Sequence, residues 1–433
     1  MLPISTAVNS RERLNRERGD PPRLLMYGHD TYGLGHLRRS LAIANHLAGA
    51  IDDLSTLLLT GSPVAHYFAL PPGADYIKLP SVVKLGDEQY RARELSMSTD
   101  SIGRLRTAII CEAATHFAPD VVLVDHAPLG AKGEMLPALR HLRRNSPHTR
   151  IVLGLRDVLD EPARVRELWA QQQVHGAIEE FYDLVMIYGQ PDIFDPVEAY
   201  GFSPRMAAKT VFTGYVQRED PIRPASALRA ELNLGEEPFV LVTAGGGGDG
   251  LQLQKTFLEA CAHLDRSLFG SAVIITGPLM SPADRAQLEG LCAGRPVRLL
   301  DFHPDLPGLM RASDLVVAMG GYNTVCEILA GRCPALIVPR AHPRLEQDIR
   351  ARAFVKRGLL AMLPEDELSP LNLAAAVATT LAARQSLASN HWRWNSRGLP
   401  CIASHIKRLA GAECLECGFR IESGIADSHV CAP

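Results

Sequence analysis

The chain has 433 residues, of which 46% are hydrophobic and 21% are charged, a composition typical of a globular protein. Its 45 basic and 48 acidic side chains give a net charge of −3, which favours neither nucleic acid nor an anionic membrane as a partner. A chain of this length exceeds one ordinary hydrophobic core, so we expect two domains of about 200 residues each.

Residues 1–22 carry many charges and little apolar material, so we interpret them as a flexible N-terminal arm and not as an apolar signal segment. No run of 18 apolar residues follows, and we expect no transmembrane segment and a cytoplasmic location. Six cysteines lie singly among apolar or helical stretches, which is typical of reduced thiols. They are Cys111, Cys261, Cys292, Cys326, Cys333 and Cys401.

The first domain begins with a predicted strand at residues 23–27, a loop that contains Gly33 and Gly35, and a helix that begins at His36. The dinucleotide fingerprint G-x-G-x-x-G is absent from this loop, so a nicotinamide cofactor is disfavoured. Continuous apolar runs separated by helices then predict a parallel sheet that is covered on both faces. The further predicted strands are 54–60, 76–79, 121–125, 150–155, 184–188 and 210–213, with helices at 98–117 and 163–182.

Ligands of doubly wound sheets bind beyond the carboxyl ends of the strands, which draws attention to the polar residues at those positions. His36, at a helix start, is a candidate acid/base group, and its alternative is a structural or phosphate-positioning histidine. Asp125, at a strand end, is a candidate general base, and its alternative is a helix cap. His126, which follows Asp125, and the pair Arg156-Asp157 also lie at strand ends.

Turn residues and charges after residue 213 mark a boundary between a first domain at 23–216 and a second at 222–388. The second domain repeats the alternation of strand and helix, so we expect an α/β fold of two doubly wound domains that face each other across a cleft. Its predicted strands are 239–243, 272–276, 297–300, 315–319, 335–338 and 360–363.

Two glycine-rich turns of the second domain follow strand ends. Gly245, Gly246, Gly247 and Gly248 would line a pocket with backbone amides, or form a flexible surface loop. Gly320 and Gly321 precede a helix that we expect to open near Asn323 or Thr324, where free N–H groups and the helix dipole attract an anion.

Three polar residues of the second domain are further candidates. Glu327, one turn into its helix, can accept hydrogen bonds from two vicinal ribose hydroxyls, or is a solvated helix residue. Glu346 and Gln347 can bond sugar hydroxyls, or Glu346 places negative charge in the first turn of the next helix.

The C-terminal part contains an Ala/Leu-rich helix that ends near residue 388 and a helical segment at 389–410 that can cross back to the first domain. The tail, 411–433, holds four potential zinc ligands, with a flexible tail of free thiols as the alternative. These ligands are Cys414, Cys417, His429 and Cys431.

The order of these motifs over about residues 23–385 resembles that of the GT-B glycosyltransferases related to MurG, which have a glycosyltransferase family 28-like C-terminal domain. The motifs that carry the resemblance are Gly33-Leu-Gly-His36, Thr213-Gly214 with Arg218, Gly245 to Gly248, Gly320-Gly-Tyr-Asn-Thr-Val-Cys-Glu327, Gly331-x-x-Pro334, Pro339-Arg340 and Glu346-Gln347. The resemblance implies that the first domain is the acceptor side and that the second domain binds a nucleotide-sugar donor.

Carried over residue by residue, the resemblance implies that Glu327 holds the donor ribose and that Gly321, Asn323 and Thr324 hold the diphosphate. Gln347, with Glu346 beside it, would contact the donor sugar. Arg218 would lie near the diphosphate, and Gly245 to Gly248 would line the same pocket.

Two departures from the family pattern concern the pocket and the acceptor. Met319 stands where MurG-type enzymes have a histidine before the glycine pair. The apolar patch associated with lipid acceptors has no clear equivalent, which puts a lipid-linked acceptor in doubt.

We therefore expect inverting transfer from a UDP-sugar, such as a UDP-N-acetylhexosamine, to a hydroxyl acceptor that His36 or Asp125 deprotonates. No metal or other cofactor is required in this scheme, because backbone amides and Arg218 take the place of a metal ion at the diphosphate. The sequence pattern implies no particular oligomeric state. One alternative is a UDP-sugar hydrolase, because Gly33, Gly35, His36 and Arg39 also resemble the hydrolases of the pseudaminic acid pathway. The other is a non-catalytic nucleotide-sugar binding subunit.

Overall fold

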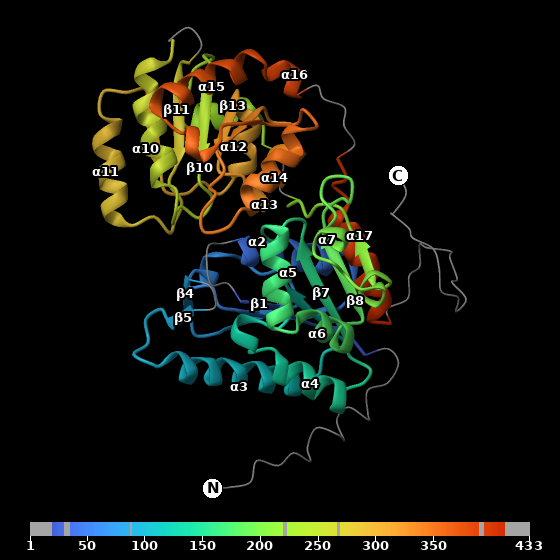
Figure 1. The fold of residues 1–433 in the computed structure, drawn as a ribbon. Helices are drawn as coiled ribbons and strands as arrows, with labels where there is room; N and C mark the ends of the chain where they lie inside the picture. Colours follow the sequence, from blue (N-terminus) through green and yellow to red (C-terminus); the bar gives the residue numbers. More distant parts are fainter. Residues whose placement is uncertain are drawn as a thin grey trace.

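The computed structural model describes residues 20–29, 35–86, 89–219, 223–265, 269–388 and 394–411. They form two α/β domains, each built around a parallel sheet with helices packed against it (Figure 1). The N-terminal domain is drawn mostly in blue and green, and the C-terminal domain in yellow and orange.

The sheet of the first domain has seven parallel strands in the order β3-β2-β1-β6-β7-β8-β9. The order reverses direction between β1 and β6, which are adjacent, with Leu24 of β1 beside Val121 of β6. The strands are β1 (Arg23–Gly28), β2 (Ser55–Thr60), β3 (Ala74–Lys78), β6 (Val121–Asp125), β7 (Arg150–Arg156), β8 (Leu184–Tyr188) and β9 (Thr210–Phe212). The helices are α2 (Gly35–Ala50), α3 (Thr99–Phe117), α4 (Leu136–Asn145), α5 (Pro162–Gln171), α6 (Val174–Phe181), α7 (Pro196–Ala199) and α8 (Pro204–Ala207).

The sheet of the second domain has six parallel strands in the order β12-β11-β10-β13-β14-β15, with the reversal between β10 and β13. The strands are β10 (Phe239–Thr243), β11 (Ser271–Ile275), β12 (Val297–Leu300), β13 (Leu315–Ala318), β14 (Ala335–Ile337) and β15 (Ala361–Met362). The helices are α9 (Ala225–Glu231), α10 (Leu251–Ala260), α11 (Pro282–Cys292), α12 (Leu306–Ala312), α13 (Tyr322–Ala330), α14 (Glu346–Val355), α15 (Pro370–Ala382) and α16 (Arg384–Ala388).

Every strand predicted in the two domains is present, most with bounds shifted by one or two residues. The continuous apolar runs that predicted them are buried, as at β6 and β10, where every residue is buried. The prediction of a doubly wound α/β fold with two such sheets is confirmed.

Three local features differ from the predictions. The helix expected at 163–182 is two helices, α5 and α6, because Gln173 between them has a left-handed φ of 55°. The helix expected to end near 388 is interrupted at Ala383, between α15 and α16. An antiparallel hairpin of β4 (Val82–Gly86) and β5 (Gln89–Ala92) was not predicted.

The last described helix, α17 (Gly398–Leu409), returns to the first domain and packs against α2 (Figure 1). The ring of Trp394, which precedes it, stacks on that of Tyr215 with ring centroids 4.1 Å apart. A Cβ at Gly398 would lie 2.3 Å from the carbonyl oxygen of Tyr215, so only glycine fits at the start of this helix. The C-terminal segment therefore packs onto the connection between the two domains.

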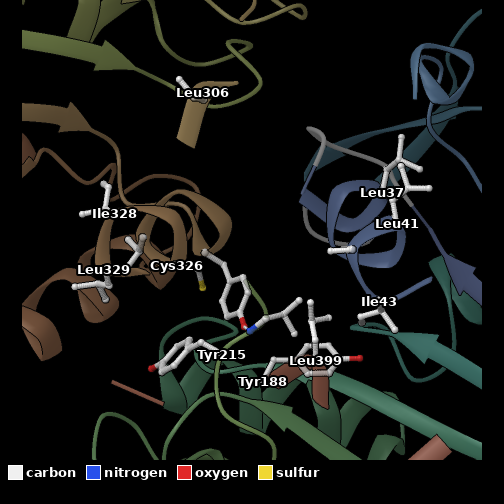
Figure 2. Packing of buried hydrophobic residues seen from close by; sticks show 14 of the residues in the cluster. Leu37, Leu41, Ile43, Tyr188, Tyr215, Leu306, Cys326, Ile328, Leu329 and Leu399 are labelled. Atoms are coloured by element: carbon white, nitrogen blue, oxygen red, sulfur yellow. Dashed lines mark hydrogen bonds between the residues drawn. The ribbon is translucent and has the colours of Figure 1, made fainter. Parts of the chain in front are cut away.

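One hydrophobic cluster extends through both domains. It joins Leu37 and Leu41 of α2 to Tyr215 in the connection and to Cys326 and Ile328 of α13. In Figure 2, Leu37 and Leu41 lie on one side of the view and Ile328 on the other, with Tyr215 and Cys326 between them. Because these side chains pack together across the domain boundary, the cluster stabilises the arrangement of the two domains in this structure.

Among the described residues, no helix is long and apolar enough to cross a membrane, and no group of three or more His, Cys, Asp or Glu side chains could hold a metal ion. The six cysteines outside the tail are free thiols, of which Cys326, Cys333 and Cys401 are buried. The proposed zinc ligands of the tail, like Gly33, lie outside the described residues.

Candidate active site

The two reversal points of the sheets face a common cavity of about 350 Å³, which we call the interdomain cavity. It takes residues from the N-terminus of α2 in the first domain and from the loops after β10 and β13 in the second. A reversal of strand order opens a crevice at the carboxyl end of a sheet, which explains the location. The predicted site residues that line it are Gly35, His36, Gly245, Gly246, Gly247, Gly248, Gly321, Asn323, Thr324 and Gln347.

His36 and Asp125 form a hydrogen-bonded pair at the first-domain wall of this cavity. Nδ1 of His36 lies 2.6 Å from Oδ2 of Asp125. Arg39, one turn further along α2, donates to both carboxylate oxygens of Asp125, at 2.9 and 2.6 Å. In the tautomer in which Nδ1 donates to the carboxylate, Nε2 of His36 is left to accept a proton.

The surroundings of Asp125 keep its carboxylate ionised. Burial opposes ionisation, but Arg39 and His36 outweigh it and hold the pKa of Asp125 well below its ordinary value. The carboxylate can therefore orient the His36 ring and stabilise a protonated imidazole. The geometry places His36 on the cavity wall and Asp125 behind it.

The glycine loop after β10 is shaped by a close approach to the next loop. Gly247 has φ +89°, and a Cβ there would lie 2.1 Å from the carbonyl oxygen of Thr276. Gly248 has no atom within 4 Å of a Cβ placed on it, and it lines the cavity. Gly247 therefore shapes the loop, whereas Gly248 leaves room for a ligand.

The two glycines before α13 also differ in role: one shapes the loop and the other lines the cavity. Gly320 has φ +81°, and a Cβ on it would meet the side chain of Ile337 at 2.7 Å. Gly321 lines the cavity and is the N-cap residue of α13, which begins at Tyr322, one residue before the predicted start. The side chain of Asn323 donates to the carbonyl oxygen of Gly35 at 3.1 Å and so connects the two walls.

Glu327 is buried one turn into α13, close to Arg218 from the connection between the domains. The guanidinium Nη1 of Arg218 is 3.9 Å from Oε1 of Glu327, and the carboxylate is 5% exposed. The structure therefore brings these two predicted donor-binding residues together, next to the part of α13 that lines the cavity.

Glu346 and Gln347, at the start of α14, have different surroundings. Gln347 accepts from the backbone N–H of Arg340 at 3.1 Å and lines the cavity. Glu346 forms an ion pair with Arg156 of the first domain, with a separation of 2.6 Å. Burial opposes its ionisation, but Arg156 and further arginines lower the pKa of Glu346 to about 2. Its carboxylate thus connects the domains instead of facing the cavity.

A fully buried ion pair also joins the domains. Arg350 of α14 donates to Asp157, which follows β7, with its shortest hydrogen bond at 2.9 Å. It also donates to the carbonyl oxygen of Gly320 at 3.2 Å. The position of Asp157 after a predicted strand drew attention to it, whereas nothing in the local sequence indicated Arg350 as its partner.

Sequence reasoning did not single out two arginines of the cavity, Arg38 and Arg93. Arg93, which follows the unpredicted hairpin, is brought to the cavity wall by β5. The cavity is therefore much more basic than the chain as a whole. Its arginines are Arg38, Arg39, Arg93, Arg156 and Arg340, with Asp249 as the lining acid among the described residues.

Residues 239–405 match the model of the glycosyltransferase family 28 C-terminal domain. An uncharacterised glycosyltransferase of Methanopyrus kandleri is 29% identical over 208 residues, which are 47% of this chain and 56% of the relative. A UDP-N-acetylglucosamine–N-acetylmuramyl-(pentapeptide) pyrophosphoryl-undecaprenol N-acetylglucosamine transferase of Glaesserella parasuis is 26% identical over 172 residues, 40% of this chain and 48% of the relative. The chain thus spans about half the length of these curated relatives.

Among solved structures, MurG of Acinetobacter baumannii superimposes with a TM-score of 0.55 at 15% identity. The match covers 90% of this chain and 100% of the MurG chain. This likeness shows the fold: the chain is a GT-B protein. With the family match and the curated relatives, it is a GT-B protein related to MurG, and its second domain is of the family 28 type.

Proposed function

We propose that the protein is a glycosyltransferase that moves a sugar from a nucleotide diphosphate, of which UDP is the expected form, to a hydroxyl group of an acceptor. The observation that carries the proposal is the position of the His36–Asp125 pair on one wall of a cavity whose other wall is two glycine-rich loops. A base and an anion-binding surface that face each other are what glycosyl transfer needs.

The second domain, 222–388, would bind the donor and the first, 23–216, the acceptor, with α17 of the C-terminal segment packing back onto the first. The diphosphate would lie at the N-terminus of α13, where Gly321, Asn323 and Thr324 border the cavity. Glu327 would accept hydrogen bonds from the ribose hydroxyls, with Arg218 beside it. Gln347 would contact the sugar.

The reaction would proceed with inversion. Nε2 of His36 removes the proton of the acceptor hydroxyl, and the oxygen attacks the anomeric carbon on the face opposite the diphosphate. The bond from that carbon to the diphosphate oxygen breaks, and the nucleoside diphosphate leaves with the electron pair. Asp125 stabilises the imidazolium, and the cavity arginines with the α13 N–H groups stabilise the leaving group without a metal.

The proposal is tested by incubating the protein with a panel of nucleotide sugars, with and without hydroxyl acceptors, and measuring release of nucleoside diphosphate and formation of the glycoside. Acceptor-dependent release is the expected result. Stoichiometric release without acceptor would favour the hydrolase, in which water is the acceptor. Tight UDP binding without turnover on any acceptor would favour the binding subunit.

A further inference from the structure

A second cavity of about 470 Å³ lies mainly in the first domain, where His29 and His126 line it; we call it the α5 pocket. Its apolar wall comes mainly from α5 and the segments next to it: Leu129, Leu159, Val165, Leu168, Trp169 and Val174. The volume of the pocket is within the range of small-molecule binding sites.

The α5 pocket meets the interdomain cavity at a cluster of three histidines. His29 and His126 line the α5 pocket, and His36 lines the interdomain cavity. The ring centroids of His29 and His126 lie 4.5 and 5.1 Å from that of His36. A molecule in the α5 pocket that contacts His29 and His126 therefore lies next to His36, which lines the cavity proposed for the donor.

The two flanking histidines are neutral and have hydrogen-bonding capacity to spare. Burial lowers the pKa of His29 and of His126 well below the ordinary value. The neighbouring His36 lowers the pKa of His29 further, and Arg156 lowers that of His126. Nε2 of His126 accepts from Arg156 at 3.3 Å, so its Nδ1 carries the proton. Nδ1 of each ring is shielded from solvent and has no hydrogen-bond partner among the residues that the structure describes.

The charges of the α5 pocket are predominantly positive. Lys132, Arg164 and Arg344 line it, with Asp160 as the lining acid among the described residues. Asp160 is engaged, because it accepts from the backbone N–H of Leu345 at 2.8 Å and lies 3.6 Å from Arg164. The side chain of Arg344 makes no hydrogen bond or ion pair within the described part of the chain.

Arg344 is held over the pocket by its two neighbours. Leu345 donates to Asp160, as above, and the carbonyl oxygen of Pro343 accepts from Arg164 at 2.7 Å. Both anchors lie at the start of α5 in the first domain, whereas Arg344 belongs to the second. The backbone on both sides of Arg344, a residue of the second domain, is therefore held at a pocket that lies mainly in the first domain.

The wall opposite is equally well fixed. The loop after β6 is held by Tyr27 and Arg106, which both donate to Glu134, at 2.5 and 2.6 Å. Tyr182 donates to the carbonyl oxygen of Pro128 in the same loop. The pocket therefore has its shape before a ligand arrives, which lowers the entropic cost of binding.

We infer that the α5 pocket binds the acceptor, and that the acceptor is a soluble hydroxyl compound with an apolar body and a carboxylate or phosphate group. This inference rests on the proposed function. The apolar body packs against α5 around Trp169, the anionic group pairs with Arg344, and the hydroxyl lies among the histidines next to His36.

The test uses the full chain and a panel of hydroxyaryl carboxylates, such as 4-hydroxyphenylacetate, each paired with its neutral amide, and measures affinity by calorimetry. Carboxylates are expected to bind more tightly than amides. Arg344→Ala should weaken carboxylate binding by about tenfold or more and leave the amides unchanged, because one charge-assisted hydrogen bond is lost. Arg352→Ala, which removes an exposed arginine of α14 that pairs with Asp348, is the control and should change nothing.

Several results would overturn the inference: equal affinity for carboxylates and amides, no binding by any carboxylate of the panel, or the same loss in the Arg344→Ala and Arg352→Ala variants. Binding of a polyprenyl diphosphate sugar in detergent, with every soluble carboxylate failing, would replace the soluble class by a lipid-linked one. UDP-sugar consumption measured on the same preparation separates the two proposals. Consumption without carboxylate preference contradicts only the inference, and failure to bind any nucleotide sugar contradicts the proposed function.

Discussion

Nδ1 of His36 lies 2.6 Å from a carboxylate oxygen of Asp125, and Arg39 holds that carboxylate from behind with two further hydrogen bonds. His36 and Arg39 belong to α2, and Asp125, at the end of β6, lies 89 and 86 positions further along the chain. The arrangement assigns different roles to the two residues predicted as bases. His36 can exchange protons at the cavity, whereas Asp125 keeps its charge and orients the ring.

Replacing His36 by Ala should lower kcat by about 10²- to 10⁴-fold with little change in the donor KM, because the base acts in the transition state and not in donor binding. Steady-state kinetics at saturating donor measures both constants. His116→Ala, an exposed histidine of α3, is the control. Full turnover in the His36→Ala variant would contradict the assignment.

Asp125→Asn should lower kcat as well, because the amide can accept from Nδ1 but cannot stabilise an imidazolium. The variant also leaves the buried Arg39 without its partner charge, so its stability must be measured beside its activity. A folded Asp125→Asn protein with unchanged kcat and an unchanged pH profile would show that Asp125 does not act through His36.

Gly247 and Gly248 are adjacent, yet alanine should affect them differently. Gly248→Ala is expected to fold normally and to raise the donor KM several-fold, because its new methyl group enters open space on the cavity wall. Gly247→Ala should lower the melting temperature, since the left-handed φ of +89° and the contact with Thr276 both exclude a side chain. Thermal unfolding and donor kinetics distinguish the two, and the same phenotype in both variants would contradict the division of roles.

The prediction of the sheets succeeded where the signal was local. The continuous apolar runs of β6 and β10 are strands with the predicted bounds, because burial on both faces demands unbroken apolar sequence. The hairpin of β4 and β5 was missed, because its sequence is short, mixed in polarity and lacks an Asn-Gly turn. That hairpin brings Arg93 to the cavity, so this arginine was missed with it.

Contacts between the domains depend on tertiary structure and had no local signal. Asp157 and Arg350 are 193 positions apart, and neither residue type nor spacing relates them. The glycine motifs were easier to predict, because a backbone that approaches a ligand or crosses another loop requires glycine itself. Even there, the pattern did not distinguish Gly320, which packs against Ile337, from Gly321, which lines the cavity.

Glu327 provides a test of the nucleotide end of the cavity. In the wild-type protein UDP should bind about tenfold more tightly than 2′-deoxy-UDP, because a buried carboxylate accepts from the ribose hydroxyl. In Glu327→Gln the preference should shrink, whereas in Glu289→Gln, an exposed residue of α11, it should persist. Titration calorimetry with the two nucleotides measures it, and an undiminished preference in Glu327→Gln would exclude Glu327 as the ribose acceptor.

The ion pair of Glu346 with Arg156 predicts a pH dependence of stability. Because the pKa of Glu346 in the folded protein is about 2 and its ordinary value is 4.5, the folded state favours the ionised form. The pair therefore stabilises the protein fully above pH 4.5, and this contribution falls as the pH decreases through the folded pKa. The difference between the two pKa values corresponds to about 3 kcal/mol of unfolding free energy at pH 7.

Denaturant unfolding of the wild type and of Glu346→Gln should show a difference of about 3 kcal/mol at pH 7 that shrinks to about 1 kcal/mol at pH 3. Glu289→Gln should show no such trend, because its carboxylate is exposed and its pair with Arg285 lies on the surface. A difference for Glu346→Gln that stays constant between pH 7 and pH 3 would mean that the folded state does not lower the pKa of Glu346. The loss of this pair in acid should also loosen α14 from the first domain, since Arg156 and Glu346 belong to different domains.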